Sequence, residues 1–280
     1  MKKVKKESLY SALMTQVKSD KRTAIVFFIM QGLVILVGVR SVMLGNYEHT
    51  MLCLLSLVLF MMPAFIERKL GIDIPPLLEA SVYLFIFAAE ILGEISSFYI
   101  KFPHWDDMLH TANGFLCAAL GFSLVEIFNR SNKVKFNLSP FFLAVVAFCF
   151  SMTIGVLWEF FECVMDQFFL LDMQKDAITN TISTVMLDPE GGNKPVIIRD
   201  ITDVILVSGG QEISLGLGGF LDIGLLDTMK DLWVNFLGAV VFSAIGYFYV
   251  KGRGRGWFAK RFIPKVVDAI QEKISPDGEE

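Results

Sequence analysis

Six long apolar runs constrain the fold of this chain more than any other feature of its sequence. Each run is close to the roughly 20 residues that an α-helix needs to cross the hydrocarbon core of a bilayer. Inside that core the backbone polar groups must bond to one another, which favours helices. With 54% hydrophobic residues over 280 positions, the chain is typical of an all-α integral membrane protein with a six-helix transmembrane bundle. The predicted spans are 23–44, 50–66, 76–100, 107–128, 140–162 and 230–250.

The basic residues predict which way these helices run. With a cytoplasmic N-terminus, nineteen of the 25 Lys and Arg residues fall in four segments on the inner side. Lys and Arg are enriched in short cytoplasmic loops. We therefore expect a multi-pass protein of the plasma membrane with both termini in the cytoplasm. The four segments are 1–22, 67–75, 129–139 and 251–280.

The parts of the chain outside the transmembrane spans have distinct characters. Residues 1–22 are basic, with apolar residues at helical spacing, and predict a cytoplasmic amphipathic segment. We expect this segment to be retained, because the apolar run after it is too long for a signal peptide. The tail 251–280 is also basic and amphipathic. Within the transmembrane domain 23–250, residues 163–229 alternate β-branched residues with Gly, Asn and Asp, which predicts an extracytoplasmic loop with β-structure that acts as a lid.

Acidic residues collect at one depth of the predicted bundle, in its outer half. Pairs and triplets of them recur at spacings of three or four residues, which keeps each set on one face of its helix. The residues are Glu90 and Glu94 on the third span, Asp107 and His110 on the fourth, Glu159, Glu162 and Asp166 at the end of the fifth, and Asp227, Asp231 and Asn235 at the start of the sixth.

These carboxylates predict a bound cation. A charge within the hydrocarbon costs at least about 2.5 kcal/mol, so several carboxylates at one depth need protons or cations to neutralise them. An oxygen-rich set with one imidazole favours a divalent cation such as Mg²⁺, Mn²⁺ or Ca²⁺ over Zn²⁺, which prefers more His or Cys ligands. The predicted metal ligands are Glu90, Glu94, Glu159, Glu162 and Asp231, with Asp227, Asn235 and Asp166 in supporting positions and Asp107 and His110 as candidate acid/base residues.

Three motifs resemble a known family of membrane proteins. WDDxLH opens the fourth predicted span, WExxE closes the fifth, and DTxxDLxxNxxGA opens the sixth. In this order they resemble the YjdF-type family of uncharacterised bacterial inner-membrane proteins and, more distantly, the VanZ-like proteins, in which Lys stands in place of Asp107. The resemblance implies a bundle of about six helices in a bacterial or archaeal cell envelope. For VanZ-like members it also implies a link to glycopeptide resistance.

The residues leave three classes of function open. The first is a hydrolase or transferase at the outer leaflet, whose cation polarises a phosphoryl or acyl oxygen or activates water. Its substrate would be a membrane lipid or a lipid-linked envelope precursor. The second is a cation-coupled transporter, although such sites usually lie near the membrane midplane. The third is a non-enzymatic scaffold in which a cation ties helix ends together. The sequence indicates no nucleic-acid binding and no particular protein partner.

Overall fold

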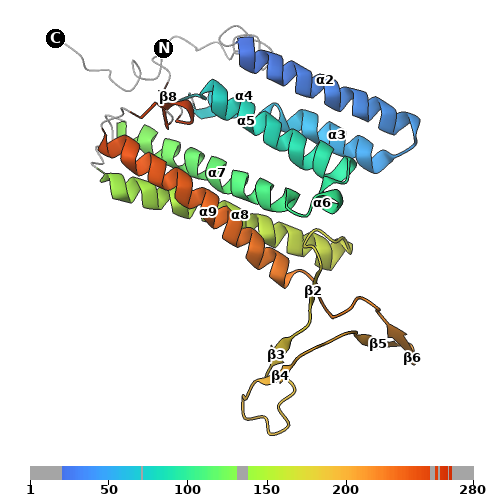
Figure 1. The fold of residues 1–280 in the computed structure, drawn as a ribbon. Helices are drawn as coiled ribbons and strands as arrows, with labels where there is room; N and C mark the ends of the chain where they lie inside the picture. The colour runs from blue at the N-terminus through green and yellow to red at the C-terminus, as the bar shows by residue number, and fades with distance from the viewer. Residues whose placement is uncertain are drawn as a thin grey trace, which may run out of the picture. The chain divides into compact units, whose positions relative to one another are not determined.

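The computed structural model describes residues 21–70, 72–130, 138–252, 256–257, 259–263 and 265–266. Within these residues, six helical stretches are long and apolar enough to cross a membrane, which confirms the predicted all-helical fold (Figure 1). The predicted segment 1–22 lies almost wholly outside the described residues. The six stretches are α2 (Lys21–Met43), α3 (Tyr47–Leu59) with α4 (Met62–Leu70), α5 (Pro76–Ile86) with η1 (Phe87–Ile95), α7 (Trp105–Arg130), α8 (Pro140–Phe169) and α9 (Leu225–Lys251).

The chain divides into two compact units. The first unit comprises Met1–Gly155 and Val234–Glu280, and the second comprises Val156–Trp233. The division falls within α8 and α9, so each of these helices contributes to both units. The first unit contains most of the helical bundle, and the second contains the C-terminal end of α8, the N-terminal end of α9 and several short β-strands.

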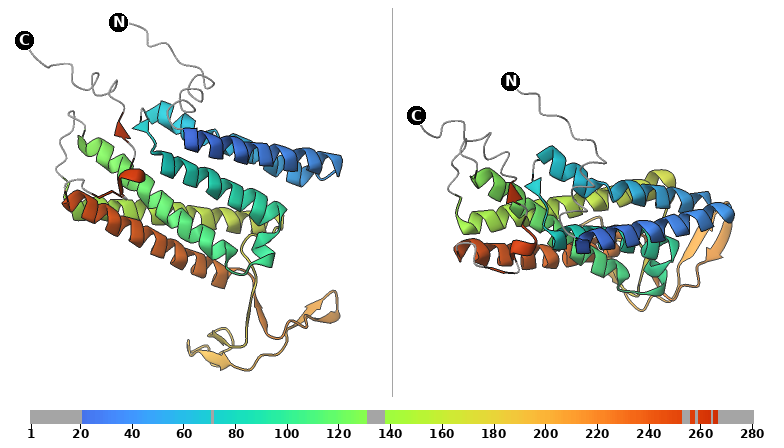
Figure 2. Two further views of the ribbon diagram at one scale, coloured as in Figure 1. Left: turned by 45° about the horizontal axis from the view of Figure 1, so that its top comes forward. Right: turned by 90° about the horizontal axis from the view of Figure 1, so that it is seen from above.

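Helices α2, α3 and α5 of the first unit lie side by side around a buried aromatic cluster (Figures 1 and 2). The rings of Phe27 and Tyr83 have centroids 5.1 Å apart, and those of Phe60 and Tyr83 are 5.8 Å apart at a steep interplanar angle. Lipid tails are as apolar as these side chains, so close packing rather than the hydrophobic effect favours such contacts. Thr23 adds a polar tie, since its hydroxyl donates to the carbonyl of Pro76 at 3.3 Å.

A second buried cluster of the first unit joins α7 to α8 and α9. Phe122, Leu143 and Phe242 are fully buried in it. Phe262, which follows α9, also belongs to this cluster and packs edge-on against Phe115 at 5.2 Å. The aromatic contact holds the segment after α9 against the bundle.

The third span differs from its predicted form. Its second half, η1, is a π-helix, and it ends at Ile95 rather than at residue 100. Ser97 then adopts a left-handed conformation with φ of 59°, which separates η1 from the short helix α6 (Phe98–Lys101). A π-helix is wider than an α-helix and is frequently found at functional sites. The expected α-helical spacing of Glu90 and Glu94 therefore does not apply as predicted.

The second unit confirms the predicted β-structure in the loop, but the loop is shorter than expected. Helix α8 continues to Phe169, and α9 already begins at Leu225, where the carboxylate of Asp222 accepts the backbone N–H of Leu226 at 2.8 Å. Three antiparallel strand pairs lie between them. They are β2 (Ala177–Thr179) with β7 (Phe220–Asp222), β3 (Ile182–Thr184) with β4 (Val196–Ile198), and β5 (Ile205–Ser208) with β6 (Gln211–Ser214).

Asp203 should control the stability of the β5–β6 hairpin. Its carboxylate accepts the hydroxyl of Ser214 and the backbone N–H groups of Val204 and Gly216, the latter two at 2.8 Å. These hydrogen bonds, that of Ser214 foremost, hold the pKa of Asp203 below its ordinary value. A lowered folded-state pKa means that this stabilisation is complete above the ordinary carboxyl pKa and is lost as pH falls through the folded value.

We therefore expect Asp203→Asn to speed amide hydrogen exchange in the hairpin severalfold at neutral pH. Wild-type protein should show the same increase only in strongly acidic solution. Asp200→Asn is the matched control, because Asp200 lies nearby with φ of 56°, a left-handed conformation that Asn also tolerates. Equal exchange rates in wild type and Asp203→Asn would contradict this role.

The predicted basic, amphipathic tail 251–280 lies largely outside the described residues. Its described part contains a 3₁₀ turn, η2 (Ala259–Arg261), and the short strand β8 (Lys265–Val266). Strand β8 pairs antiparallel with β1 (Ile72–Asp73), which precedes α5. The tail is thus fastened to the first unit by strand pairing.

Candidate functional site

The first unit contains a polar contact shared by three helices. Asn235 of α9 is fully buried, and its Oδ1 accepts a hydrogen bond from Nδ2 of Asn113 on α7 at 3.2 Å. Its own Nδ2 lies 3.6 Å from the sulfur of Met152 on α8. Gly155 leaves room for the same amide, because a Cβ there would lie 2.7 Å from Nδ2 of Asn235. The contacts of this amide therefore fix the positions of α7, α8 and α9 along their axes relative to one another within the unit.

Two glycines let α7 and α9 approach backbone to backbone. A Cβ on Gly114 would lie 2.1 Å from the backbone oxygen of Asn235, and a Cβ on Gly238 would lie 2.1 Å from that of Thr111. The hydroxyl of Ser151 on α8 donates to the carbonyl of Gly114 at 2.7 Å. Small residues at helix crossings permit such close contacts in membranes. The three helices therefore form a tight crossing within the first unit.

The first turns of α7 carry two contacts between an acid and a histidine. Nε2 of His110 lies 3.6 Å from Oδ1 of Asp106, one turn earlier. Nδ1 of His104 lies 2.9 Å from Oδ2 of Asp107. His110 is only 6% exposed, whereas His104 lies on the surface. Of the two predicted acid/base residues, His110 is therefore the buried one, and Asp107 pairs with an exposed imidazole.

The acids of the third span lie on η1. Glu90 is half-buried and Glu94 is exposed. The indole N–H of Trp105 donates to the carbonyl of Ala88 at 3.3 Å, which ties η1 to the start of α7. The expected participation of Glu90 and Glu94 in a metal site stays a prediction.

Four acidic side chains of the second unit are buried: Glu159 and Glu162 on α8, and Asp227 and Asp231 on α9. Glu159 is 3% exposed and Asp231 is 0% exposed, so these two are the most deeply buried of the set. The indole N–H of Trp158 donates to Oε1 of Glu162 at 2.8 Å. The metal site that the sequence predicts from these residues stays a prediction.

Two acids hold the segment that leaves α8. The carboxylate of Asp166 accepts the backbone N–H groups of Met173 and Gln174 at 2.7 and 2.8 Å. The carboxylate of Asp227 accepts the backbone N–H of Lys175 at 2.8 Å. Residues 173–175 are thereby bonded to the C-terminal end of α8 and to the start of α9.

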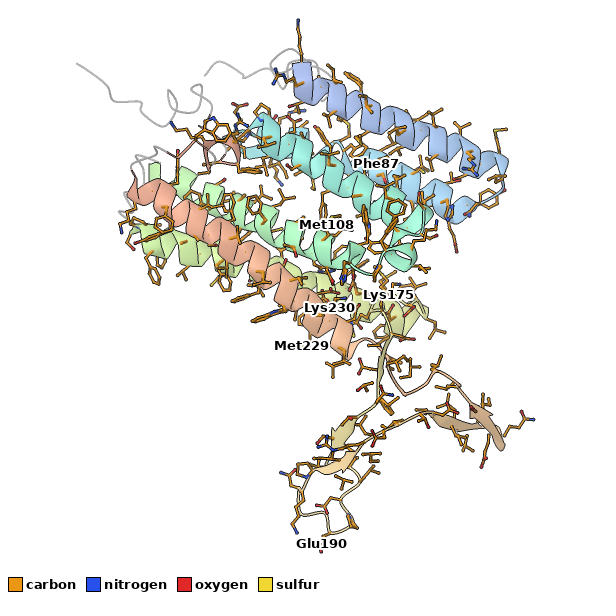
Figure 3. All side chains as sticks on the ribbon, viewed as in Figure 1. Phe87, Met108, Lys175, Glu190, Met229 and Lys230 are labelled. Carbon is orange, nitrogen blue, oxygen red and sulfur yellow. The ribbon has the colours of Figure 1, made fainter. Side chains whose placement is uncertain are left out.

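One basic side chain lies next to Asp227. Nζ of Lys230 lies 3.7 Å from Oδ1 of Asp227, whereas Nζ of Lys175 lies 3.9 Å from Oδ2 of Asp172; both lysines are labelled in Figure 3. Because both oxygens of Asp227 already have partners, its geometry suits a role in holding the loop. Asp166 has the same role. The supporting positions expected for both residues around a metal site stay a prediction.

Helix geometry sets Glu159 and Asp231 at one level. Gly155 of α8 packs against Asn235 of α9, and the two helices run antiparallel (Figure 1). Glu159 is four residues after Gly155, and Asp231 is four residues before Asn235. Residues four apart share a helix face, so Glu159 lies on the Gly155 face of α8 and Asp231 lies on the Asn235 face of α9. Two buried carboxylates thus project from facing sides of one helix pair.

Sequence reasoning missed the partners that fasten the loop. The backbone N–H groups of Met173, Gln174 and Lys175 carry no signal in side-chain identity, so only the fold reveals them. Gln174 also donates through its amide to the hydroxyl of Thr228 at 2.5 Å. The spacing of Asp166 and Asp227 at the ends of two spans is the one sequence signal that could have indicated such ties.

Comparison with known families adds one finding. The family model described as predicted membrane protein (DUF2238) matches residues 24–252, which include the six helical stretches except the first three residues of α2, and the loop between α8 and α9. No curated protein and no solved structure matches the chain. The family match is consistent with the YjdF-type resemblance and with a multi-pass membrane protein, and it does not extend to the VanZ-like proteins.

Proposed function

Since the chain belongs to the DUF2238 family of predicted membrane proteins, we propose that it is a multi-pass membrane enzyme with a divalent cation at its centre. The enzyme is a hydrolase or transferase that acts on a lipid or on a lipid-linked envelope substrate at the outer leaflet. The basic residues of the inner segments support this orientation, because they place the acid-bearing helix ends outside.

The observation that carries the proposal is the burial of Glu159 and Asp231 on facing sides of α8 and α9. Two carboxylates at one level of a low-dielectric site repel each other, and a cation between them removes that cost. Carboxylate oxygens suit Mg²⁺, Mn²⁺ or Ca²⁺. Glu162 lies one turn from Glu159 and supplies a further oxygen, while the indole of Trp158 orients it. An ion so held can polarise a phosphoryl or acyl oxygen.

His110 is the proposed proton carrier. It is buried on the first turns of α7, and it precedes Asn113, which bonds to Asn235, by three residues. An imidazole beside Asp106 is oriented by that carboxylate and can exchange protons near neutral pH.

Access from the membrane is supported by the outer surface of α8. Leu157, Trp158 and Phe160 are exposed on the same helix turns that carry the buried Glu159. Large apolar side chains at such positions contact lipid. A lipid-linked substrate can therefore reach the acidic residues along the bilayer rather than from water.

A structural cation in a scaffold protein is the second candidate. It is favoured by the hydrogen bonds of Asp166 and Asp227, which show that acids in this unit already fasten the loop to the helices. A cation could extend the same fastening without catalysing a reaction. Turnover, rather than cation binding, distinguishes the two candidates.

The test is lipid turnover in nanodiscs prepared from a bacterial lipid extract that contains lipid-linked envelope precursors. Wild-type protein with Mg²⁺, Mn²⁺ or Ca²⁺ should consume one lipid class, as seen by mass spectrometry. His110→Gln should lower the rate at least about 100-fold, the usual contribution of acid/base catalysis. Glu48→Gln, at an exposed position on α3, is the control and should keep the wild-type rate. No turnover by wild type with any of these cations would favour the scaffold.

A further inference from the structure

A cavity of about 430 Å³ lies in the first unit and shares no lining residue with the acidic residues described above. It is bordered by the first turns of α2 and α5 and by η2 of the tail. Of the residues that the structure describes, the cationic side chains of Arg22, Lys260 and Arg261 and the carboxylate of Asp73 line it. This described lining therefore carries two more positive than negative charges.

The fold brings these charges together from distant parts of the sequence. The β1–β8 pairing sets Asp73 opposite Lys265 and returns the tail to the start of α5. Phe262 and Ile263 directly follow η2, and their buried side chains anchor this part of the tail. The cavity is consequently a built feature of the first unit rather than a chance grouping on a surface.

One cation is held in a fixed orientation. The guanidinium carbon of Arg261 lies 3.8 Å from the ring centroid of Trp257, a stacked arrangement. Stacking leaves the edge of the guanidinium, with its N–H donors, available to an anion. Arg donors in this planar arrangement match phosphate oxygens in pairs.

The other side of the cavity is apolar. Val26 of α2 and Leu77 and Ala80 of α5 line it. Both helices begin at this level, at Lys21 and Pro76, and then continue as membrane spans. The cavity thus lies at the border of the bilayer, with cations toward the helix ends and apolar side chains toward the hydrocarbon.

We propose that this cavity binds the phosphate of an anionic phospholipid, with the acyl chains leaving along Val26 and Leu77. A phosphate diester carries one negative charge and offsets half of the positive surplus of the described lining, and the glycerol and first methylene groups fit the apolar side. Basic pockets between transmembrane helices on the cytoplasmic side bind such headgroups. The many Lys and Arg residues of the inner segments assign the lipid to the cytoplasmic leaflet. This site is independent of the proposed enzymatic centre.

The test uses full-length protein in nanodiscs of equal parts phosphatidylglycerol and phosphatidylcholine. After extraction into mild detergent, mass spectrometry measures which lipid remains bound. Wild-type protein should retain phosphatidylglycerol selectively. Each basic residue near an anionic surface contributes about 1 kcal/mol, or about fivefold in affinity. Lys260→Gln and Arg22→Gln should each weaken retention about fivefold, and the variant with Arg22, Lys260 and Arg261 all changed to Gln should weaken it about 100-fold.

Two matched controls carry a positive charge elsewhere in the first unit. Arg40 lies at the far end of α2, and Lys251 is the last residue of α9. Arg40→Gln and Lys251→Gln should retain phosphatidylglycerol as wild type does. If the triple variant does not fold, as judged by gel filtration, the single variants decide the outcome.

Several results would overturn the proposal. Equal retention of both lipids by wild type would do so, as would equal losses in the cavity variants and the controls. A third arm adds inorganic phosphate alone. Tight binding of phosphate that depends on Arg22 and Lys260, without any preference for phosphatidylglycerol, would assign the cavity to a free anion instead of a lipid.

Discussion

Purified protein carrying both Glu159→Gln and Asp231→Asn should contain no divalent cation, whereas wild type should hold about one ion per chain. Removing a residue that merely orients a metal ligand weakens binding about 10–100-fold, so loss of two ligands should exceed about 100-fold. Neither amide supplies the negative charge that holds a hard cation. Inductively coupled plasma mass spectrometry after dialysis against cation-free buffer measures the content, and titration calorimetry with Mg²⁺, Mn²⁺ and Ca²⁺ measures the affinity.

Two further variants separate cation binding from other effects. Glu212→Gln changes an exposed acid on β6 of the same unit and should leave the cation content unchanged. His110→Gln should keep the cation while it lowers turnover at least about 100-fold, because His110 is proposed to carry protons. If the double variant retains its ion fully, the acids do not form the proposed cation site. If wild type binds none of the three cations, the proposed function fails with it.

The sequence predicted the helices well because the bilayer leaves few alternatives. Apolar length alone located all six spans, and the alternating pattern of 163–229 correctly indicated strands. The errors of the prediction concern the residues at which the spans begin and end. Residues 163–169 contain no helix breaker, and α8 continues until Leu170, whose φ is 56°. Such a conformation has no clear signature in a non-glycine residue, so the end of α8 was not predictable.

The candidate site was only partly predictable for a related reason. A carboxylate within a long apolar helix is expected to face the bundle interior, so the sequence predicts the burial of Glu159 and Asp231. The sequence does not predict the exposure of Glu94, because that exposure depends on the π-helical geometry of η1. The hydrogen-bonded ring of a π-helix contains one residue more than that of an α-helix. The sequence of η1, FAAEILGEI, has no feature that predicts this geometry. Helix type, rather than residue type, therefore limited the prediction on the third span.

Gly238→Ala and Gly114→Ala should each destabilise the protein severely. An added Cβ at either position would lie 2.1 Å from a backbone oxygen of the neighbouring helix, that of Thr111 or that of Asn235. A backbone atom cannot rotate away as a side chain can, so α7 and α9 must separate. Overpacking costs about 1–3 kcal/mol and occasionally more, and we expect the upper end here. Separation would also strain the hydrogen bond between Asn113 and Asn235.

The expected result is a fall of about 5–10 °C in the apparent melting temperature of detergent-solubilised protein, measured by intrinsic fluorescence. Gly32→Ala on α2 is the matched control, because nothing lies within 4 Å of a Cβ at that position. In a helix interior Ala is favoured over Gly by roughly 1 kcal/mol, so this control should melt at or above the wild-type temperature. Wild-type melting of Gly238→Ala would mean that α7 and α9 do not cross at Gly114 and Gly238. It would also remove the steric basis for the contact between Asn113 on α7 and Asn235 on α9.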